Sequence, residues 1–263
     1  NNKMNSLVSK TTFILLTLIQ FNCMAQIKNP VIAHRGAWKE FNLPQNSIAS
    51  LKKAIELKCF GTEFDVHLTK DAKMVVNHDH DFYGLDIETH TYEELNSRKH
   101  PNGEKLPTVE EYLAEGLKQT KTKLIFEIKT SNVSISRTYL MIDLIKDYLE
   151  DKNLENQIEF ILFSFDASIY IKKQLPNYKI SYLEGDKTPQ EIKQVGLDGI
   201  DYNHKVYKEN KNYLKDARKL GLITNSWTVN DKDLFLKFID EKMDVITTDY
   251  PAKFLEIYSN LKQ

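Results

Sequence analysis

The feature that most constrains the fold of this chain is a regular alternation of short apolar runs and helical segments between residues 108 and 261. The apolar runs are rich in β-branched and aromatic residues, which favours β-strands. Strands are expected at 123–129, 158–165, 180–183, 199–202, 222–229 and 245–248. Helical spacing of apolar residues predicts helices at 108–117, 136–150, 167–175, 189–195, 209–220, 231–242 and 252–261. Strands that alternate with helices pair in parallel, because each helix carries the chain back to the start of the next strand.

The part of the chain before residue 108 is less regular. Three more strand-like runs occur there, at 31–33, 61–69 and 73–78. A helix over 48–57, with Ser47 as its N-cap, follows the first run. The second and third runs are joined too closely for a helical crossover, so one of them is expected to be an irregular extension of the other. Residues 80–107 are polar, which predicts a short insertion after the strand that ends at His78, with one short helix near 92–95.

The alternation of strands and helices predicts the α/β class, and the number of strand–helix units indicates which α/β fold. So many units in one domain-sized chain favour a closed (β/α)8 barrel, the TIM barrel, over an open sheet. An open, doubly wound sheet is the alternative, but neither a G-x-G-x-x-G nor a Walker A segment supports it.

The N-terminal segment has the pattern of a secretory signal peptide. Lys10 precedes a short apolar run at 13–19. Small residues at positions −3 and −1, Cys23 and Ala25, then indicate a cleavage site after Ala25. The apolar run is shorter than the roughly 20 residues that span a bilayer. We therefore expect residues 1–25 to be removed, residues 26–263 to form a single catalytic domain, and the protein to be periplasmic or secreted. A retained anchor, or a lipid attached to Cys23, is the alternative.

Composition limits the partners of the chain. The net charge is −1 and no polybasic run is present, which argues against a nucleic-acid partner. No stretch after residue 25 is long and apolar enough to span a membrane. Cys59 is the one cysteine left after cleavage, so neither an internal disulfide nor a cysteine-based metal site is expected, and burial is the usual state of such a thiol. The sequence gives no indication of oligomeric state.

Two carboxylates in the predicted strand 61–69 indicate a metal site. Side chains two residues apart on a strand point to the same face, so Glu63 and Asp65 lie together among apolar neighbours. Two like charges on one face need a compensating cation. Oxygen ligands suit a hard divalent ion such as Mg²⁺ or Ca²⁺. A solvated outer face of an edge strand is the ordinary alternative.

Residues able to do chemistry also end other predicted strands. They are His34, Arg35, His78, Asp79, Glu127, Lys129 and Trp227. In a (β/α)8 barrel the C-terminal ends of the strands meet on one face, so these side chains are expected to converge. Each alone has an ordinary explanation as a surface, capping or core residue. Together with Glu63 and Asp65, these residues belong to five predicted strand ends. So many chemically active side chains at one end of a barrel favour an active site. The other histidines, at 67, 80, 90, 100 and 204, are assigned ordinary roles.

These motifs together resemble the signature of the glycerophosphodiester phosphodiesterases, whose barrel is of the phospholipase-C-like phosphodiesterase type. The matching segments are 34–36 (HRG), 44–47 (PQNS), 63–66 (EFDV), 68–71 (LTKD), 75–79 (VVNHD), 126–129 (FEIK), 227–230 (WTVN) and 248–251 (TDYP). The resemblance spans about residues 32–251. It implies a metal-dependent enzyme that hydrolyses glycerophosphodiesters to an alcohol and sn-glycerol 3-phosphate.

The resemblance also implies roles for individual residues. Glu63, Asp65 and Glu127 would bind one divalent metal ion, either Ca²⁺ or Mg²⁺. His34 and His78 would be the general acid/base pair, because histidine is the side chain that ordinarily titrates near neutral pH. The substrate-binding residues would be Arg35, Lys129, Trp227 and Asn46. Arginine and lysine suit phosphate oxygens because they supply a bidentate fork and a point charge respectively.

Two departures from the family pattern leave the substrate open. Gln45 stands where the family commonly has an acid, and the segment 80–85 differs from the usual run after the histidine-aspartate pair. A related lysophospholipase D or phosphoinositide-type phosphodiesterase on the same barrel is the alternative function. A barrel that binds a phosphorylated ligand without turnover is a third, which the retained histidines and carboxylates argue against.

Overall fold

The computed structural model describes residues 29–262. The predicted signal peptide, with its cleavage site after Ala25, and Cys23 lie outside the described residues. Cys59 lies within them and is a buried, free thiol. Within residues 29–262, the helices are all too short or too polar to cross a bilayer.

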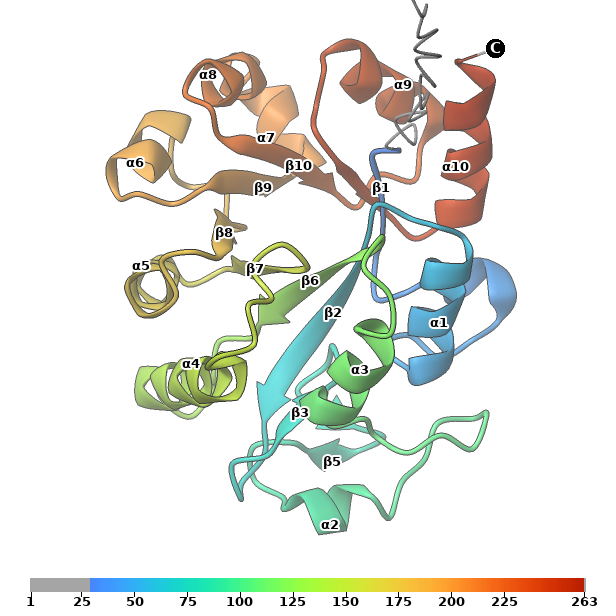
Figure 1. Ribbon diagram of the computed structural model, residues 1–263, viewed down its shortest axis with the longest axis vertical. Coiled ribbons are helices and arrows are strands. Elements are labelled where there is room, and N and C mark those ends of the chain that lie inside the picture. Colours follow the sequence, from blue (N-terminus) through green and yellow to red (C-terminus); the bar gives the residue numbers. More distant parts are fainter. Residues whose placement is uncertain (1–28, 263) are drawn as a thin grey trace, which may run out of the picture.

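Eight parallel strands form the barrel, and helices surround them (Figure 1). The strands are β1 (Val31–Ala33), β2 (Gly61–Leu68), β6 (Lys123–Ile128), β7 (Ile158–Leu162), β8 (Lys179–Tyr182), β9 (Gly199–Asn203), β10 (Ile223–Trp227) and β11 (Ile246–Thr248). Their spatial order is β10-β9-β8-β7-β6-β2-β1-β11. The (β/α)8 barrel predicted from the strand–helix alternation is confirmed.

The ring is nearly closed between β10 and β11. Within the described residues these two strands share no ladder, but the Val245 amide donates to the Thr224 carbonyl at 3.1 Å. The Val229 amide donates to the Thr247 carbonyl at 2.9 Å, and the Asn225 side chain donates to the Thr247 hydroxyl at 3.0 Å. These bonds join β10 to β11. Since β11 also pairs directly with β1, they complete the ring of strands.

The ninth strand-like run is the expected extension. Strand β3 (Met74–Val76) folds back antiparallel on the outer end of β2, with Val76 opposite Val66. The insertion that follows holds the hairpin β4 (Asp81–Phe82) and β5 (Leu85–Asp86) and the short helix α2 (Tyr92–Leu95). It lies at the bottom of Figure 1. The helix was predicted, whereas strands of two residues are too short to show a pattern in the sequence.

The helices begin where the sequence offers a cap. Their bounds are η1 (Lys39–Phe41), α1 (Ile48–Glu56), α3 (Val109–Gly116), α4 (Ile135–Leu149), α5 (Phe165–Gln174), α6 (Pro189–Gln194), α7 (His204–Glu209), α8 (Tyr213–Lys219), α9 (Lys232–Asp240) and α10 (Pro251–Asn260). Ser47 caps α1 and Thr108 caps α3, each in a reciprocal capping box. Pro189 occupies the first turn of α6, where its missing N–H costs nothing.

The single helix predicted over 209–220 is confirmed only in part, because it begins later than predicted and a separate helix before it was not predicted. The structure has α7 before it and α8 within it, separated by a short break. The Asn210 side chain donates to the Val206 carbonyl at 3.0 Å and so satisfies one of the last carbonyls of α7. Asparagine side chains compete with the backbone in this way and favour helix ends. Asn203 caps the start of α7 by accepting from the Lys205 amide.

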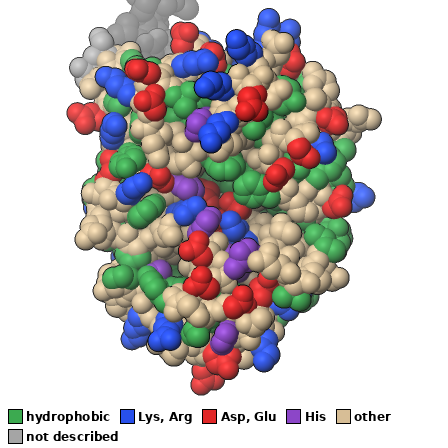
Figure 2. Space-filling view, turned by 180° about the vertical axis from the view of Figure 1, so that it is seen from behind, with side chains coloured by type: hydrophobic (Ala, Val, Ile, Leu, Met, Phe, Trp, Pro, Cys, Tyr) green, Lys and Arg blue, Asp and Glu red, His purple; other side chains and the backbone are tan. Residues whose placement is uncertain are grey.

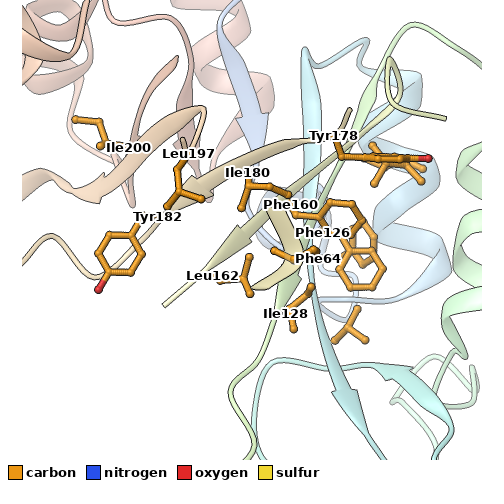
Figure 3. Close-up of a cluster of buried hydrophobic side chains, with 14 of the residues drawn as sticks. Phe64, Phe126, Ile128, Phe160, Leu162, Tyr178, Ile180, Tyr182, Leu197 and Ile200 are labelled. Atoms are coloured by element: carbon orange, nitrogen blue, oxygen red, sulfur yellow. The ribbon is translucent and has the colours of Figure 1, made fainter. Parts of the chain in front are cut away.

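Two hydrophobic layers make the core. A small inner cluster fills the barrel and consists of Ile32, Ile125, Ile161, Leu183 and Val245. A much larger outer cluster lies between the strands and the helices. In it, the rings of Phe64, Phe126 and Phe160 lie side by side on neighbouring strands (Figure 3), with centroids 4.9 and 5.2 Å apart. Tyr112 of α3 covers Phe64 at 4.5 Å.

Replacing Phe64 with alanine is expected to destabilise the protein by about 3–5 kcal/mol, because the fully buried ring leaves a cavity between β2 and α3. Equilibrium urea unfolding followed by circular dichroism measures this loss. Phe64→Leu, which refills much of the volume, serves as the control and should cost less. A loss below about 1 kcal/mol for the alanine variant would show that the outer layer closes over the gap.

Candidate active site

The inward-facing positions of the strands change from apolar to polar toward their C-terminal ends. Ile32 and His34 share the inner face of β1 and its extension, because side chains two residues apart point the same way. On β6 the inner series is Ile125, Glu127 and Lys129. The apolar residues therefore plug the barrel, and the polar ones sit above the plug at the end where barrel active sites lie.

Three buried carboxylates form the centre of this polar layer. Asp65 of β2 is directly opposite Glu127 of β6, and Glu63 is two residues before Asp65. One oxygen from each lies within 4.8 Å of the others. Their exposed fractions are only 3% for Glu63, 1% for Asp65 and 7% for Glu127. The close approach predicted for Glu63 and Asp65 is observed, and Glu127 completes a group that could bind a metal ion.

The carboxylates differ in how well their charges are compensated. Burial raises the pKa of Glu63 well above its usual range, and the charges of Asp65 and Glu127 add to the rise. Burial and the Asp65 charge raise the pKa of Glu127 to about 8. Burial also acts on Asp65, but Lys129, His78 and Arg35 outweigh it and hold the Asp65 pKa below its usual value. A further cation is needed for all three groups to be ionised at neutral pH.

Lys129 and Arg35 are the cations beside this group. The Lys129 ammonium lies 2.9 Å from Glu127 Oε1 and 3.2 Å from Asp65 Oδ1. Burial lowers the pKa of Lys129, but the two carboxylates more than reverse this and raise it. Arg35 Nε lies 3.7 Å from Asp65 Oδ2 and has no hydrogen-bond partner in the described part of the chain. The Arg35 Nε therefore acts on Asp65 through its charge and not through a hydrogen bond.

Asn46 orients Asp65 from behind. Its amide donates to Asp65 Oδ2 at 2.9 Å, and its carbonyl oxygen accepts from the Asp65 backbone amide at 3.1 Å. The side chain is fully buried and does not line the cavity. Gln45 accepts from Arg35 Nη1 at 2.8 Å and so fixes the guanidinium.

The backbone at Arg35 is held in an uncommon conformation. Arg35 has a φ of 57° and Gly36 a φ of 83°, both in the left-handed region. A Cβ atom on Gly36 would lie 2.4 Å from the Ser50 hydroxyl of α1, so only glycine fits. In this turn the Arg35 amide donates to Glu63 Oε2 at 2.8 Å. The uncommon backbone conformation therefore places this amide against a carboxylate of the site. Backbone strain of this kind is typical of functional sites.

His34 and His78 are each paired with a carboxylate. His34 Nδ1 lies 2.7 Å from Asp249 Oδ1, and the Asn230 amide donates to the other oxygen of Asp249 at 2.8 Å. His78 Nδ1 lies 2.8 Å from Asp79 Oδ1. With each Nδ1 engaged by an acceptor, Nε2 of both rings is left for other partners. Burial lowers the pKa of His78, although Asp65 opposes this.

One cavity collects most of the predicted residues. It is lined by His34, Arg35, Glu63, His78, Glu127, Lys129, Ile161, Phe163, Leu183, Asp201, Trp227 and Thr247. Figure 2 shows acidic, basic and histidine side chains gathered around a hollow near the middle of the visible face. The rings of Phe163 and Trp227 meet edge to face with centroids 5.7 Å apart, so two aromatic side chains line part of the cavity. The arrangement offers cation ligands, anion-binding side chains and two proton carriers in one place.

Sequence reasoning missed Asp201 and the role of Asp249. Asp201 lies on the inner face of β9, between the outward-facing Ile200 and Tyr202, so strand alternation could have placed it in the barrel. Asp249 is 215 residues from His34, and no local pattern connects them. The histidine at 67, assigned an ordinary role, supports the site indirectly because its Nε2 lies 3.0 Å from the His78 carbonyl.

Comparison with known proteins gives consistent matches. Residues 34–253 match the model of the glycerophosphoryl diester phosphodiesterase family. A glycerophosphodiester phosphodiesterase of Caldanaerobacter subterraneus subsp. tengcongensis is 28% identical, over 88% of this chain and 98% of that protein.

Solved structures agree in fold. A glycerophosphodiester phosphodiesterase from Parabacteroides distasonis is similar with a TM-score of 0.85 and 39% identity, covering 90% of this chain and 99% of that one. An Oleispira antarctica phosphodiesterase, solved in complex with the product sn-glycerol-3-phosphate, matches with a TM-score of 0.75 and 22% identity, covering 89% of this chain and 97% of that one. At that identity the second likeness shows the fold alone.

Proposed function

The chain belongs to the glycerophosphoryl diester phosphodiesterase family, and on that premise we propose that a divalent metal ion and two histidines serve its reaction, the hydrolysis of glycerophosphodiesters. The proposed products are an alcohol, such as choline or ethanolamine, and sn-glycerol 3-phosphate. The Oleispira antarctica phosphodiesterase was solved with sn-glycerol-3-phosphate bound as its product, which supports this choice. The observation that carries the proposal is the group of three buried carboxylates next to both histidines.

The carboxylate group fits a divalent ion. Oε1 of Glu63 is buried and lacks a hydrogen-bond partner among residues 29–262, which is costly unless a cation occupies that side. Glu63, Asp65 and Glu127 would hold the ion, and their oxygen ligands suit Ca²⁺ and Mg²⁺ alike. When bound, such an ion neutralises phosphodiester charge and favours attack at phosphorus.

The protein's own side chains would bind and orient the phosphodiester. The Arg35 guanidinium and the Lys129 ammonium would donate to its oxygens, with Gln45 keeping the guanidinium in place. Trp227 would pack against the substrate, since its indole nitrogen is already engaged by the Asp201 carbonyl at 2.8 Å and its ring faces the cavity. Asn46 would act on the metal site only through Asp65.

The two histidines would move the protons. One Nε2 would take a proton from the attacking hydroxyl, and the other would give a proton to the leaving alcohol. Asp249 would keep the His34 ring oriented, and Asp79 would do the same for His78. The attacking hydroxyl is either water or the 2-hydroxyl of the substrate glycerol, and the division of labour between the histidines holds for both.

One observation favours the related lysophospholipase D function. Ile161, Phe163 and Leu183 give the cavity an apolar wall that could accept part of an acyl chain. The same catalytic groups would serve that reaction. The two functions therefore differ in the part of the cavity that binds glycerol, not in the metal or the histidines.

Purified protein incubated with glycerophosphocholine is expected to release sn-glycerol 3-phosphate with Ca²⁺ or Mg²⁺ present. EDTA should lower the rate at least about 100-fold, because a metal ion supplies several kcal/mol of charge stabilisation. Restoring the ion after EDTA is the control and should restore the rate. Undiminished release in EDTA would contradict the metal assignment. No release with any divalent ion would point to the lysophospholipid function.

We also propose export of the protein with loss of residues 1–25, on the pattern of that segment alone. The mass of the protein recovered from the cell envelope or the medium tests this. Recovery of the intact chain from the cytoplasm would contradict it.

A further inference from the structure

We infer that Asp201 recognises the free hydroxyls of the substrate glycerol and so selects glycerophosphodiesters against their acylated forms. The inference rests on the proposed function and assigns the substrate class of the same site. Among the described residues that line the cavity, Asp201 is the acidic side chain that belongs neither to the carboxylate group nor to a histidine pair.

Asp201 lies at the inner face of β9, deep in the cavity. Its exposed fraction is 2%, and it lines the same cavity as His34, Glu127 and Trp227. Asn225 is its direct neighbour on β10, and the Trp227 indole donates to its backbone carbonyl at 2.8 Å. The main chain at this position is therefore fixed, and the carboxyl group has a defined place in the wall.

The Asp201 carboxyl group is less compensated than that of Asp65, which faces Lys129, Arg35 and Asn46. Its Oδ1 is buried without a hydrogen-bond partner among residues 29–262, and within that range no neighbouring cation shifts the pKa of the group. The neighbouring Asn225 side chain interacts with the carboxyl group, but it also donates to the Thr247 hydroxyl, and its carbonyl oxygen accepts from the Ser226 amide. A buried polar atom left in this state is costly, so a ligand that supplies a partner is the natural explanation.

The chemistry of the group matches a hydroxyl. Burial raises the pKa of Asp201 to about 8, and the nearby Asn225 side chain offsets this only in part. Near neutral pH the protonated form therefore offers both a donor and an acceptor. The glycerol hydroxyls have the same two capacities. The phosphate group of the substrate would bind elsewhere in the cavity, where Arg35 and Lys129 supply positive charge.

The same group disfavours an acyl chain. A hydrocarbon placed against Asp201 would remove water from the carboxyl without giving it a hydrogen-bond partner. A site built to hydrogen-bond a hydroxyl discriminates against analogues that lack it, because its own polar group is then left unpaired. The apolar wall of Ile161, Phe163 and Leu183 would then contact the carbon skeleton of glycerol.

Steady-state kinetics with two substrates tests the selectivity. Glycerophosphocholine and lysophosphatidylcholine are compared for the wild type, Asp201→Asn and Asp201→Leu. Asp201→Leu should raise KM for glycerophosphocholine about tenfold and change kcat less than about threefold. A tenfold change in KM is the effect expected from the loss of one uncharged hydrogen bond. The preference for glycerophosphocholine should fall by the same factor or more. Asparagine keeps a donor and an acceptor, so it should retain most of the preference.

Asp240→Asn is the matched control, because Asp240 is an exposed acid at the end of α9, outside the cavity. It should change neither KM nor the preference. Unfolding midpoints by circular dichroism show whether the Asp201 variants stay folded. An unchanged preference in folded Asp201→Leu would overturn the inference.

A binding measurement separates this inference from the proposed function. Calorimetry in Ca²⁺ compares sn-glycerol 3-phosphate with n-propyl phosphate, which lacks both hydroxyls. The wild type should prefer the glycerol compound, and Asp201→Leu should lose about tenfold of that preference while binding n-propyl phosphate as before. An equal preference in both proteins would overturn the role of Asp201. Absent turnover in the wild type would count against the proposed function only.

Discussion

Asp65→Asn should lower turnover of glycerophosphocholine by at least about 10²–10³-fold while leaving the fold intact. Such a factor is typical when one preorganised electrostatic contact is removed from an active site. Asp65 is the carboxylate on which the site converges, because Lys129, Arg35 and Asn46 all contact it. Asparagine has nearly the same shape and can still accept from Asn46, so the loss would come from the missing charge.

The measurement is kcat at saturating metal, with metal affinity from calorimetry on the same protein. Weaker metal binding should accompany the loss of turnover, and the unfolding midpoint should change little. Asp240→Asn, which removes a charge from the surface, should behave as wild type. Glu127→Gln should act like Asp65→Asn. Turnover near the wild-type rate in either variant would mean that the metal ligands are assigned incorrectly.

Removing either of the two histidines proposed to be catalytic is the second large effect that we expect. His34→Ala and His78→Ala should each slow hydrolysis of glycerophosphocholine by about 10²–10⁴-fold, the usual contribution of general acid–base catalysis. The histidine that protonates the leaving group matters less when that group leaves readily as an anion. A glycerophosphodiester of p-nitrophenol should therefore rescue one variant much more than the other.

The rescued variant identifies the general acid, and the other histidine is then the base. His90→Ala is the control, because His90 lies in the insertion, where its ring contacts the Asp86 carbonyl, outside the cavity. It should keep wild-type rates with both substrates. Equal rescue of both variants would remove the division of roles. A rate within threefold of wild type for His34→Ala or His78→Ala would exclude that residue from proton transfer.

Much of the fold follows from local sequence. Ser47, Thr108 and Pro189 mark helix starts because capping and the missing proline N–H act within one turn. The barrel follows from the strand–helix order, since parallel strands need crossovers. The break between α7 and α8 could not be foreseen, because it depends on how the Asn210 side chain competes for a carbonyl at a helix end.

The candidate site was predictable where two polar residues share one face of a strand, as Glu63 and Asp65 do on β2. It was not predictable where the role depends on a distant contact. Asn46 was expected to touch substrate, but its position behind Asp65 depends on the turn after β1. Asp249 acquires its role only because β11 closes against β1.

The insertion after β3 has a consequence for the motions of the protein. Its apolar contacts are largely its own, within a cluster of Val75, Phe82, Ile87, Leu95 and Leu106 that is separate from the barrel clusters. Its ties to the rest of the chain include polar contacts such as Glu88 with Ser131 and Arg137. Such a unit opens with a lower free energy than the whole molecule. Amide hydrogen exchange at 81–87 should therefore run faster than in β2 and β6, so the rim beside His78 opens more readily than the barrel strands. Equal protection in both regions would show that the rim and the barrel open as one unit.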